Sequence, residues 1–146
     1  MSLLEKIDTA NSLDEVLRLT IEHFQADTGT IHLLEDDGVM HLKAASAGIP
    51  QVVLERVQIV PIGKGMAGLA AERKEPVTVC NLQTDTSGAA KPGAKLTGME
   101  GALVVPILKG DDAAGALGIA NRAPRTFSEE EMALLMDVGR RIAAKS

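Results

Sequence analysis

Apolar positions in this chain follow a helical period at both ends and a strand-like period between them. In residues 13–25 apolar side chains recur every three or four positions, which predicts an amphipathic helix of about three turns. Ser12 precedes this segment and Glu15 follows three residues later, a capping box that marks the helix start. A shorter helix is predicted before it, from Leu3 to near Asn11.

Two pairs of β-rich segments predict antiparallel hairpins. Residues 28–34 and 39–46 flank Asp36-Asp37-Gly38, a strong signal for a tight turn. Residues 102–108 and 113–121 form the second pair, joined by a Lys-Gly-Asp-Asp turn. Shorter elements are expected between the hairpins, namely helices at 50–56 and 66–74 and strands at 57–60 and 77–80.

The last segment, residues 128–145, predicts the best-defined helix. Ser128 and Glu131 form another capping box, and Phe127 with Met132 fits a hydrophobic staple. Two faces of this helix are apolar, one with Leu134, Leu135, Val138 and Ile142 and a smaller one with Met132, Met136, Gly139 and Ala143. The second face favours packing against a second copy of the chain, and hence a homodimer. The alternative is that Leu3, Leu4 and Ile7 cover it within one chain.

The order of these elements predicts an α+β fold around an antiparallel sheet, in a single domain spanning residues 1–146. Residues 81–101 are rich in Gly, Thr, Ala and Lys and predict one long loop. A connection of this length inside a compact domain is usually functional or mobile.

Three glycines after the short strand spell G-x-G-x-x-G, at Gly63, Gly65 and Gly68. Dinucleotide-binding turns use this pattern directly after a strand, followed by a long helix and a parallel strand that ends in an acid. Here two residues separate the strand from Gly63, Pro76 ends the helix early, and hairpins flank the motif. The context therefore argues against a dinucleotide site, and the glycines predict a tight strand-to-helix turn.

Composition excludes several classes of protein. The net charge of −5 and the presence of only two aromatic residues, Phe24 and Phe127, argue against nucleic-acid binding. No apolar run reaches the length of about 20 residues that a membrane helix needs, and the first residues do not resemble a signal peptide. We therefore expect a cytoplasmic protein without a membrane partner.

Metal and thiol chemistry are also poorly supported. Cys80 is the only cysteine, which excludes an intrachain disulfide and a multi-cysteine zinc site. His32 and His41 fall on neighbouring predicted strands, but with no third ligand evident they are better explained as polar groups on the sheet. We expect no metal and no cofactor.

Taken in order, several motifs resemble those of the GAF domain family. They are the glycine turn and short helix "KGMAGLAAERKEPV", the strand pair "ALVVPILKGDDAAGALGIAN", and the final "RTFSEEEMALL". The resemblance covers nearly the whole chain. It implies a central antiparallel sheet of about six strands, with the terminal helices on one face and short helices plus a long lid loop over a pocket on the other.

The resemblance also implies candidate pocket residues by position, which are Thr30, Ser46, Met66, Ala67, Asp85, Thr97 and Gly118. Asn121-Arg122, Phe127 and Glu131 partly match an Asn-Lys…Phe…Asp-Glu signature of the cyclic-nucleotide-binding members. This match implies a structural ion pair between Arg122 and Glu131 rather than a ligand contact. A cyclic nucleotide is not favoured, because no aromatic side chain is left to stack on a purine.

The function implied is that of a non-catalytic, small-molecule-binding sensory domain in signal transduction, acting as a dimer through its terminal helices. One alternative is a ligand-free dimerisation module. Another is an enzyme like the free methionine sulfoxide reductases, but their chemistry needs a second thiol to resolve the first, and this chain has only Cys80.

Overall fold

The computed structural model describes residues 2–79 and 99–145. These residues form one six-stranded sheet with strand order β3-β2-β1-β6-β5-β4, in which every neighbouring pair is antiparallel. The elements are α1 (Leu3–Thr9), α2 (Leu13–Phe24), β1 (Thr28–Leu34), β2 (Val39–Ala45), α3 (Gln51–Arg56), β3 (Ile59–Pro61), α4 (Gly65–Arg73), β4 (Val77–Val79), β5 (Gly101–Lys109), β6 (Asp112–Asn121) and α5 (Glu129–Lys145).

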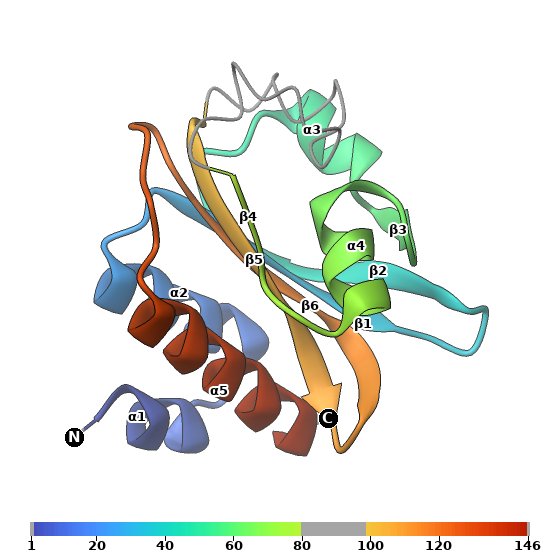
Figure 1. The fold of residues 1–146 in the computed structure, drawn as a ribbon, viewed down its shortest axis with the longest axis horizontal. Helices are drawn as coiled ribbons and strands as arrows, with labels where there is room; N and C mark the ends of the chain where they lie inside the picture. The colour runs from blue at the N-terminus through green and yellow to red at the C-terminus, as the bar shows by residue number, and fades with distance from the viewer. Residues whose placement is uncertain (1, 80–98, 146) are drawn as a thin grey trace.

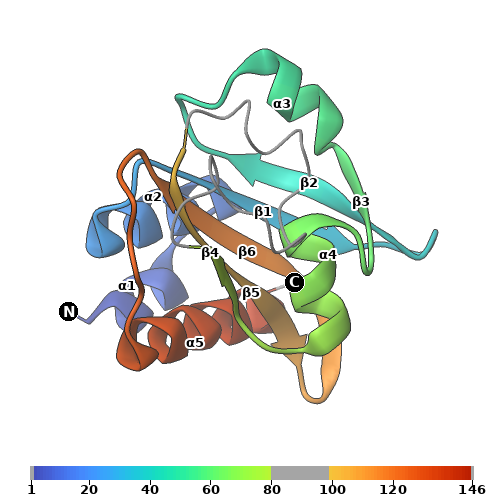
Figure 2. The same cartoon turned by 45° about the horizontal axis from the view of Figure 1, so that its top comes forward.

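Helices cover the two faces of the sheet unequally (Figure 1). The helices α1, α2 and α5 lie together on one face, whereas α3 and α4 lie on the other, and a second view shows the same separation (Figure 2). The predicted α+β architecture is confirmed, with terminal helices on one side and short helices on the other. Among the described helices, none is both long enough and apolar enough to span a membrane.

Alternation along β1 separates the core from the other face of the sheet. Ile31 and Leu33 pack in the main hydrophobic core together with Val16, Leu117 and Val138 from the surrounding elements. Because successive side chains of a strand point to opposite faces, the intervening residues of β1 are turned toward α3 and α4.

The glycine turn has the local geometry that its sequence predicts. Gly63 and Gly65 have positive φ angles of 90° and 65°. A Cβ atom on Gly68 would lie 2.5 Å from the carbonyl oxygen of Pro61, so only glycine lets α4 approach the end of β3 this closely.

The sheet around this turn excludes a dinucleotide-binding fold. β3 pairs only with β2 and β4 pairs only with β5, both antiparallel, so that the strands before and after α4 form opposite edges of the sheet. A dinucleotide site would need these two strands to be parallel neighbours.

Helix α5 begins with the expected capping box. The Ser128 hydroxyl accepts the Glu131 N–H at 3.1 Å, and a Glu131 carboxylate oxygen accepts the Ser128 N–H at 2.9 Å. Gly139 belongs to the sheet-facing side, since a Cβ there would lie 3.1 Å from the Pro106 carbonyl of β5. Leu3 and Ile7 of α1 bury their side chains in the same core as α5. Part of the second apolar face is thus covered within one chain, and the homodimer stays a prediction.

Candidate functional site

A cavity of about 570 Å³ lies between the sheet and the two short helices. Its floor comes from the three strands β1, β5 and β6, through Thr28, Gly29, Thr30, His32, Ala102, Val104, Gly118, Ile119 and Ala120. Its walls come from Gly48, Ile49, Val53, Arg56, Val57, Ile59, Val60, Pro61, Lys64, Gly65, Met66, Ala67 and Met99. Most of these side chains are apolar, and the polar ones are few.

Small residues on the sheet create this space. Gly118 of β6 lies opposite Thr30 of β1 and Val104 of β5, in the middle of the floor. Ala102 and Ala120 face each other across β5 and β6. Larger side chains at these positions would fill the volume between the sheet and α4.

His32 is the most buried polar side chain of the floor, with an exposed fraction of 3%. Its Nε2 atom lies 2.8 Å from the Val57 carbonyl oxygen. A carbonyl only accepts, so Nε2 carries the proton and Nδ1 of the neutral ring is an acceptor. Within the described residues, this buried Nδ1 has no hydrogen-bond partner. Burial lowers the pKa of His32, and the hydrogen bond to Val57 only partly offsets this effect.

Two cationic side chains stand at the border of the cavity. Arg56 is the last residue of α3, and Lys64 directly precedes α4; both are exposed. No aspartate or glutamate occurs among the described lining residues. Residues 2–79 and 99–145 therefore contribute positive charge to the border of the cavity.

The structure brings together four of the predicted pocket residues and separates a fifth. Thr30, Met66, Ala67 and Gly118 line the cavity. Ser46 is not a lining residue, because its hydroxyl accepts the Gly29 N–H at 3.0 Å beside the sheet. Two further predicted residues, Asp85 and Thr97, lie outside the described residues.

Sequence reasoning missed His32 and Arg56 as lining residues. His32 follows Thr30 at a spacing of two, so the alternation of a strand places both on one face. This signal was present in the sequence. No comparable signal identified Arg56.

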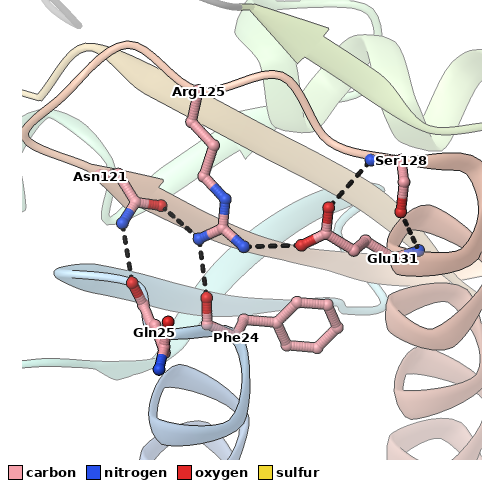
Figure 3. A network of polar contacts seen from close by, with 6 residues as sticks. All are labelled: Phe24, Gln25, Asn121, Arg125, Ser128 and Glu131. Atoms are coloured by element: carbon pink, nitrogen blue, oxygen red, sulfur yellow. Dashed lines mark hydrogen bonds and ion pairs between the residues drawn. The ribbon is translucent and has the colours of Figure 1, made fainter.

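The predicted ion pair between Arg122 and Glu131 is wrong, because Arg125 takes the place of Arg122 (Figure 3). An Arg125 Nη2 atom lies 2.6 Å from the Glu131 carboxylate, and Nη1 donates to the Phe24 carbonyl at 2.7 Å. Arg122 instead donates its backbone N–H to Asp27 at 2.7 Å. This backbone contact lies at the end of β6, and Arg125, three residues later, is the arginine whose guanidinium contacts Glu131 at the start of α5.

Arg125 also connects further elements of the structure. Its Nη1 atom donates to the side chain of Asn121 at 2.9 Å, and Asn121 donates to the Gln25 carbonyl at 2.9 Å (Figure 3). The guanidinium carbon stands 4.5 Å from the centre of the Phe127 ring. These contacts join α2, β6 and α5 away from the cavity, so the residues form a structural clip.

The histidine pair considered from the sequence does not form. His41 lies opposite Leu33 in the β1–β2 register, on the face covered by α1, α2 and α5, whereas His32 lies on the cavity face. His41 instead contacts Asp37 at 2.7 Å and Glu35 at 3.2 Å. The His41 ring thus bridges two exposed carboxylates on the β1–β2 hairpin, and we assign no metal to these three residues.

Comparisons with known proteins agree with this geometry. A family model described as a GAF domain matches residues 10–144. No curated protein sequence matches the chain significantly.

Similar solved structures include both domains of larger proteins and free methionine-R-sulfoxide reductases. The GAF domain of an Acinetobacter phosphoenolpyruvate-protein phosphotransferase is 23% identical with a TM-score of 0.78, covering 97% of this chain and 86% of that one. A domain of a putative two-component sensor histidine kinase from Sinorhizobium meliloti is 18% identical, with a TM-score of 0.71 and coverage of 93% and 92%. Free methionine-R-sulfoxide reductase from Neisseria meningitidis is 14% identical, with a TM-score of 0.77 and coverage of 98% and 83%. At these identities the likeness extends to the fold alone.

Proposed function

Because the chain belongs to the GAF domain family, we propose that it is a regulatory domain that binds a small molecule without catalysing a reaction. The observation that carries the proposal is the cavity of about 570 Å³ on the face of the sheet opposite the terminal helices. Clefts of this size, lined by apolar side chains with a few convergent polar groups, are typical of small-molecule sites.

The position of the cavity supports a role in signalling. β1 and β6 supply its floor, and the opposite faces of the same two strands pack against the layer of terminal helices. A ligand that displaces these strands acts on that helix layer without an intermediate element. The occurrence of this fold in domains of a phosphotransferase and a putative sensor kinase supports the same role.

Reduction of free methionine sulfoxide is the second candidate, since such reductases share the fold. In a cysteine-based reductase, a thiolate attacks the substrate sulfur and a second thiol then releases the oxidised cysteine. The chain has one cysteine, Cys80, so the second thiol would have to come from another molecule. The regulatory role needs no such co-reactant.

The proposal is tested by following thermal unfolding with a panel of small metabolites. A ligand that binds only the folded state at about 100 times its Kd stabilises that state by about 2.7 kcal/mol. We expect at least one compound, or a compound released from the purified protein and identified by mass spectrometry, to raise the melting temperature by several degrees.

A matched pair of variants shows whether the compound occupies the cavity. Gly118→Leu adds a side chain to the floor, where the nearest atom to the new Cβ is a movable Val104 methyl at 3.2 Å. It should abolish the shift. Lys109→Leu adds the same side chain at an exposed site on the β5–β6 hairpin and should retain the shift. If no compound stabilises the protein, a ligand-free dimerisation module is the better explanation. Turnover of methionine-R-sulfoxide with a thiol reductant, lost in Cys80→Ser, would establish the enzyme instead.

A further inference from the structure

The charged side chains among the described lining residues of the cavity are both cationic. Arg56 and Lys64 are the only charged side chains among its described lining residues. Neither forms an ion pair or hydrogen bond with any other described residue. Two cations without a partner in the described part of the chain, at the border of an apolar space, favour a ligand with negative charge at one end.

The start of α4 adds hydrogen-bond donors to the same border. Gly65, Met66 and Ala67 line the cavity, and within the described chain their backbone N–H groups have no acceptor. Lys64 occupies the N-cap position and its side chain cannot accept a hydrogen bond. The unpaired amides of a first helical turn attract anions through their partial positive charge.

His32 provides an independent indication of a ligand. Its Nδ1 atom is a buried acceptor without a partner in the described structure, whereas its Nε2–H is fixed by Val57. Buried polar groups are nearly always hydrogen-bonded in native proteins. His32 belongs to the cavity lining, so a donor on a bound molecule is a candidate partner for Nδ1.

We propose that the cavity takes a small organic anion with an apolar body and a hydrogen-bond donor. Arg56, Lys64 and the N-terminus of α4 hold the charged end, and Nδ1 of His32 accepts from the donor. This inference rests on the proposed function, since it names the class of ligand that the same cavity binds.

Two dyes with the same apolar body test the proposal. Anilinonaphthalene sulfonate carries an N–H donor and a sulfonate, whereas N-phenylnaphthylamine carries the N–H donor without the charge. The chain contains no tryptophan or tyrosine, so dye fluorescence is read against little protein emission. We expect both dyes to bind the wild-type protein and to be excluded by Gly118→Leu.

Removal of the cations separates the two dyes. Arg56→Gln combined with Lys64→Gln should raise the Kd of the sulfonate about fivefold or more and leave that of the neutral dye unchanged. Lys109→Gln combined with Arg140→Gln makes the same change in net charge away from the cavity and should alter neither Kd. High ionic strength should weaken the sulfonate relative to the neutral dye in the wild-type protein itself.

Removal of the acceptor affects both dyes alike. His32→Gln keeps a donor for the Val57 carbonyl but replaces the Nδ1 acceptor by an amide oxygen at a different position, and should raise both Kd values about fivefold. Equal Kd values for the sulfonate with and without Arg56 and Lys64 would overturn the anion inference while leaving a small-molecule site intact. Dye binding that survives Gly118→Leu, or failure of both dyes to bind, would also contradict the inference about the class of ligand. The metabolite panel tests the proposed function independently of the dyes.

Discussion

At the residue scale, Arg125 connects parts of the chain that are about a hundred positions apart. It binds the Phe24 carbonyl at the end of α2, Asn121 at the end of β6, and Glu131 in the first turn of α5. Its side chain is 23% exposed, so these charge-assisted hydrogen bonds are partly shielded from water. The neighbouring Arg122 is exposed and contributes only its backbone N–H to this corner.

Replacing these two arginines should therefore have very different effects. Arg125→Gln should lower the free energy of unfolding by about 2 kcal/mol, because the Phe24 carbonyl and the Glu131 carboxylate both lose a charged donor. Arg122→Gln should change it by less than about 0.5 kcal/mol. Urea denaturation of both variants measures the two free energies of unfolding. A larger loss of stability for Arg122→Gln than for Arg125→Gln would contradict the prediction and favour the Arg122–Glu131 ion pair.

His32 makes stability depend on pH near neutrality. Burial lowers the pKa of its imidazole in the folded state. Between that lowered pKa and the ordinary value of about 6.5, the unfolded chain binds more protons than the folded one. Acidification through this interval therefore lowers the free energy of unfolding. Above the interval His32 is neutral in both the folded and the unfolded chain, and this loss is absent.

The variant His32→Gln should show a shallower loss of stability on acidification. The slope of the unfolding free energy should fall by up to about 1.4 kcal/mol per pH unit below neutrality. Val52→Gln, which changes an exposed side chain on α3 without a titratable group, should keep the wild-type slope. Denaturant titrations at a series of pH values measure these slopes. Parallel wild-type and His32→Gln curves would show that His32 titrates normally.

At the scale of elements, the bend before α4 depends on contacts between backbone atoms. A Cβ on Gly68 would meet the Pro61 carbonyl at 2.5 Å and the Gly63 nitrogen at 3.0 Å. Neither atom belongs to a flexible side chain, so the helix itself would have to move. Gly110 in the β5–β6 turn has a positive φ of 64° but open space around it.

Gly68→Ala should therefore destabilise the protein despite alanine's better helix propensity of about 1 kcal/mol. Overpacking should cost about 3 kcal/mol, which leaves a net loss of about 2 kcal/mol. Gly110→Ala should lose only about 1 kcal/mol, from backbone strain. Thermal or urea unfolding compares the two, and a stabilised Gly68→Ala variant would contradict the close approach of α4 to β3.

Most elements were predictable because local signals and tertiary structure agree. The capping boxes at Ser12 and Ser128 mark true helix starts, and the Asp-Asp-Gly turn joins two true strands. The register of β1 and β2 shifts between Ile31 and His32, where Lys43 is left without a paired residue on β1 in a β-bulge. The sequence did not predict this bulge, because Lys43 is not distinguished from other strand residues. Pro106 has no N–H to donate, but it is tolerated within β5 because β4 pairs with β5 only over residues 102–104.

At the scale of the whole molecule, the candidate site was predictable only in part. Positions on the strands and at the glycine turn, such as Thr30 and Met66, follow from order and alternation. The choice between Arg122 and Arg125 could not be made from spacing, because residues 122–128 belong to no regular element. Asp27 holds the backbone N–H of Arg122, and Glu131 holds the guanidinium of Arg125, so partners outside this segment decide which arginine forms the ion pair.

The two outermost strands are connected through a single nine-residue helix that crosses the sheet between them. β3 leads into α4 and α4 leads into β4, so this helix is tethered at both margins. Residues 62–64 and 74–76 are the only links between α4 and these two strands, so a shift of α4 toward or away from the central strands pulls on both margins. The depth of the cavity beneath α4 is thus coupled to the positions of both edge strands.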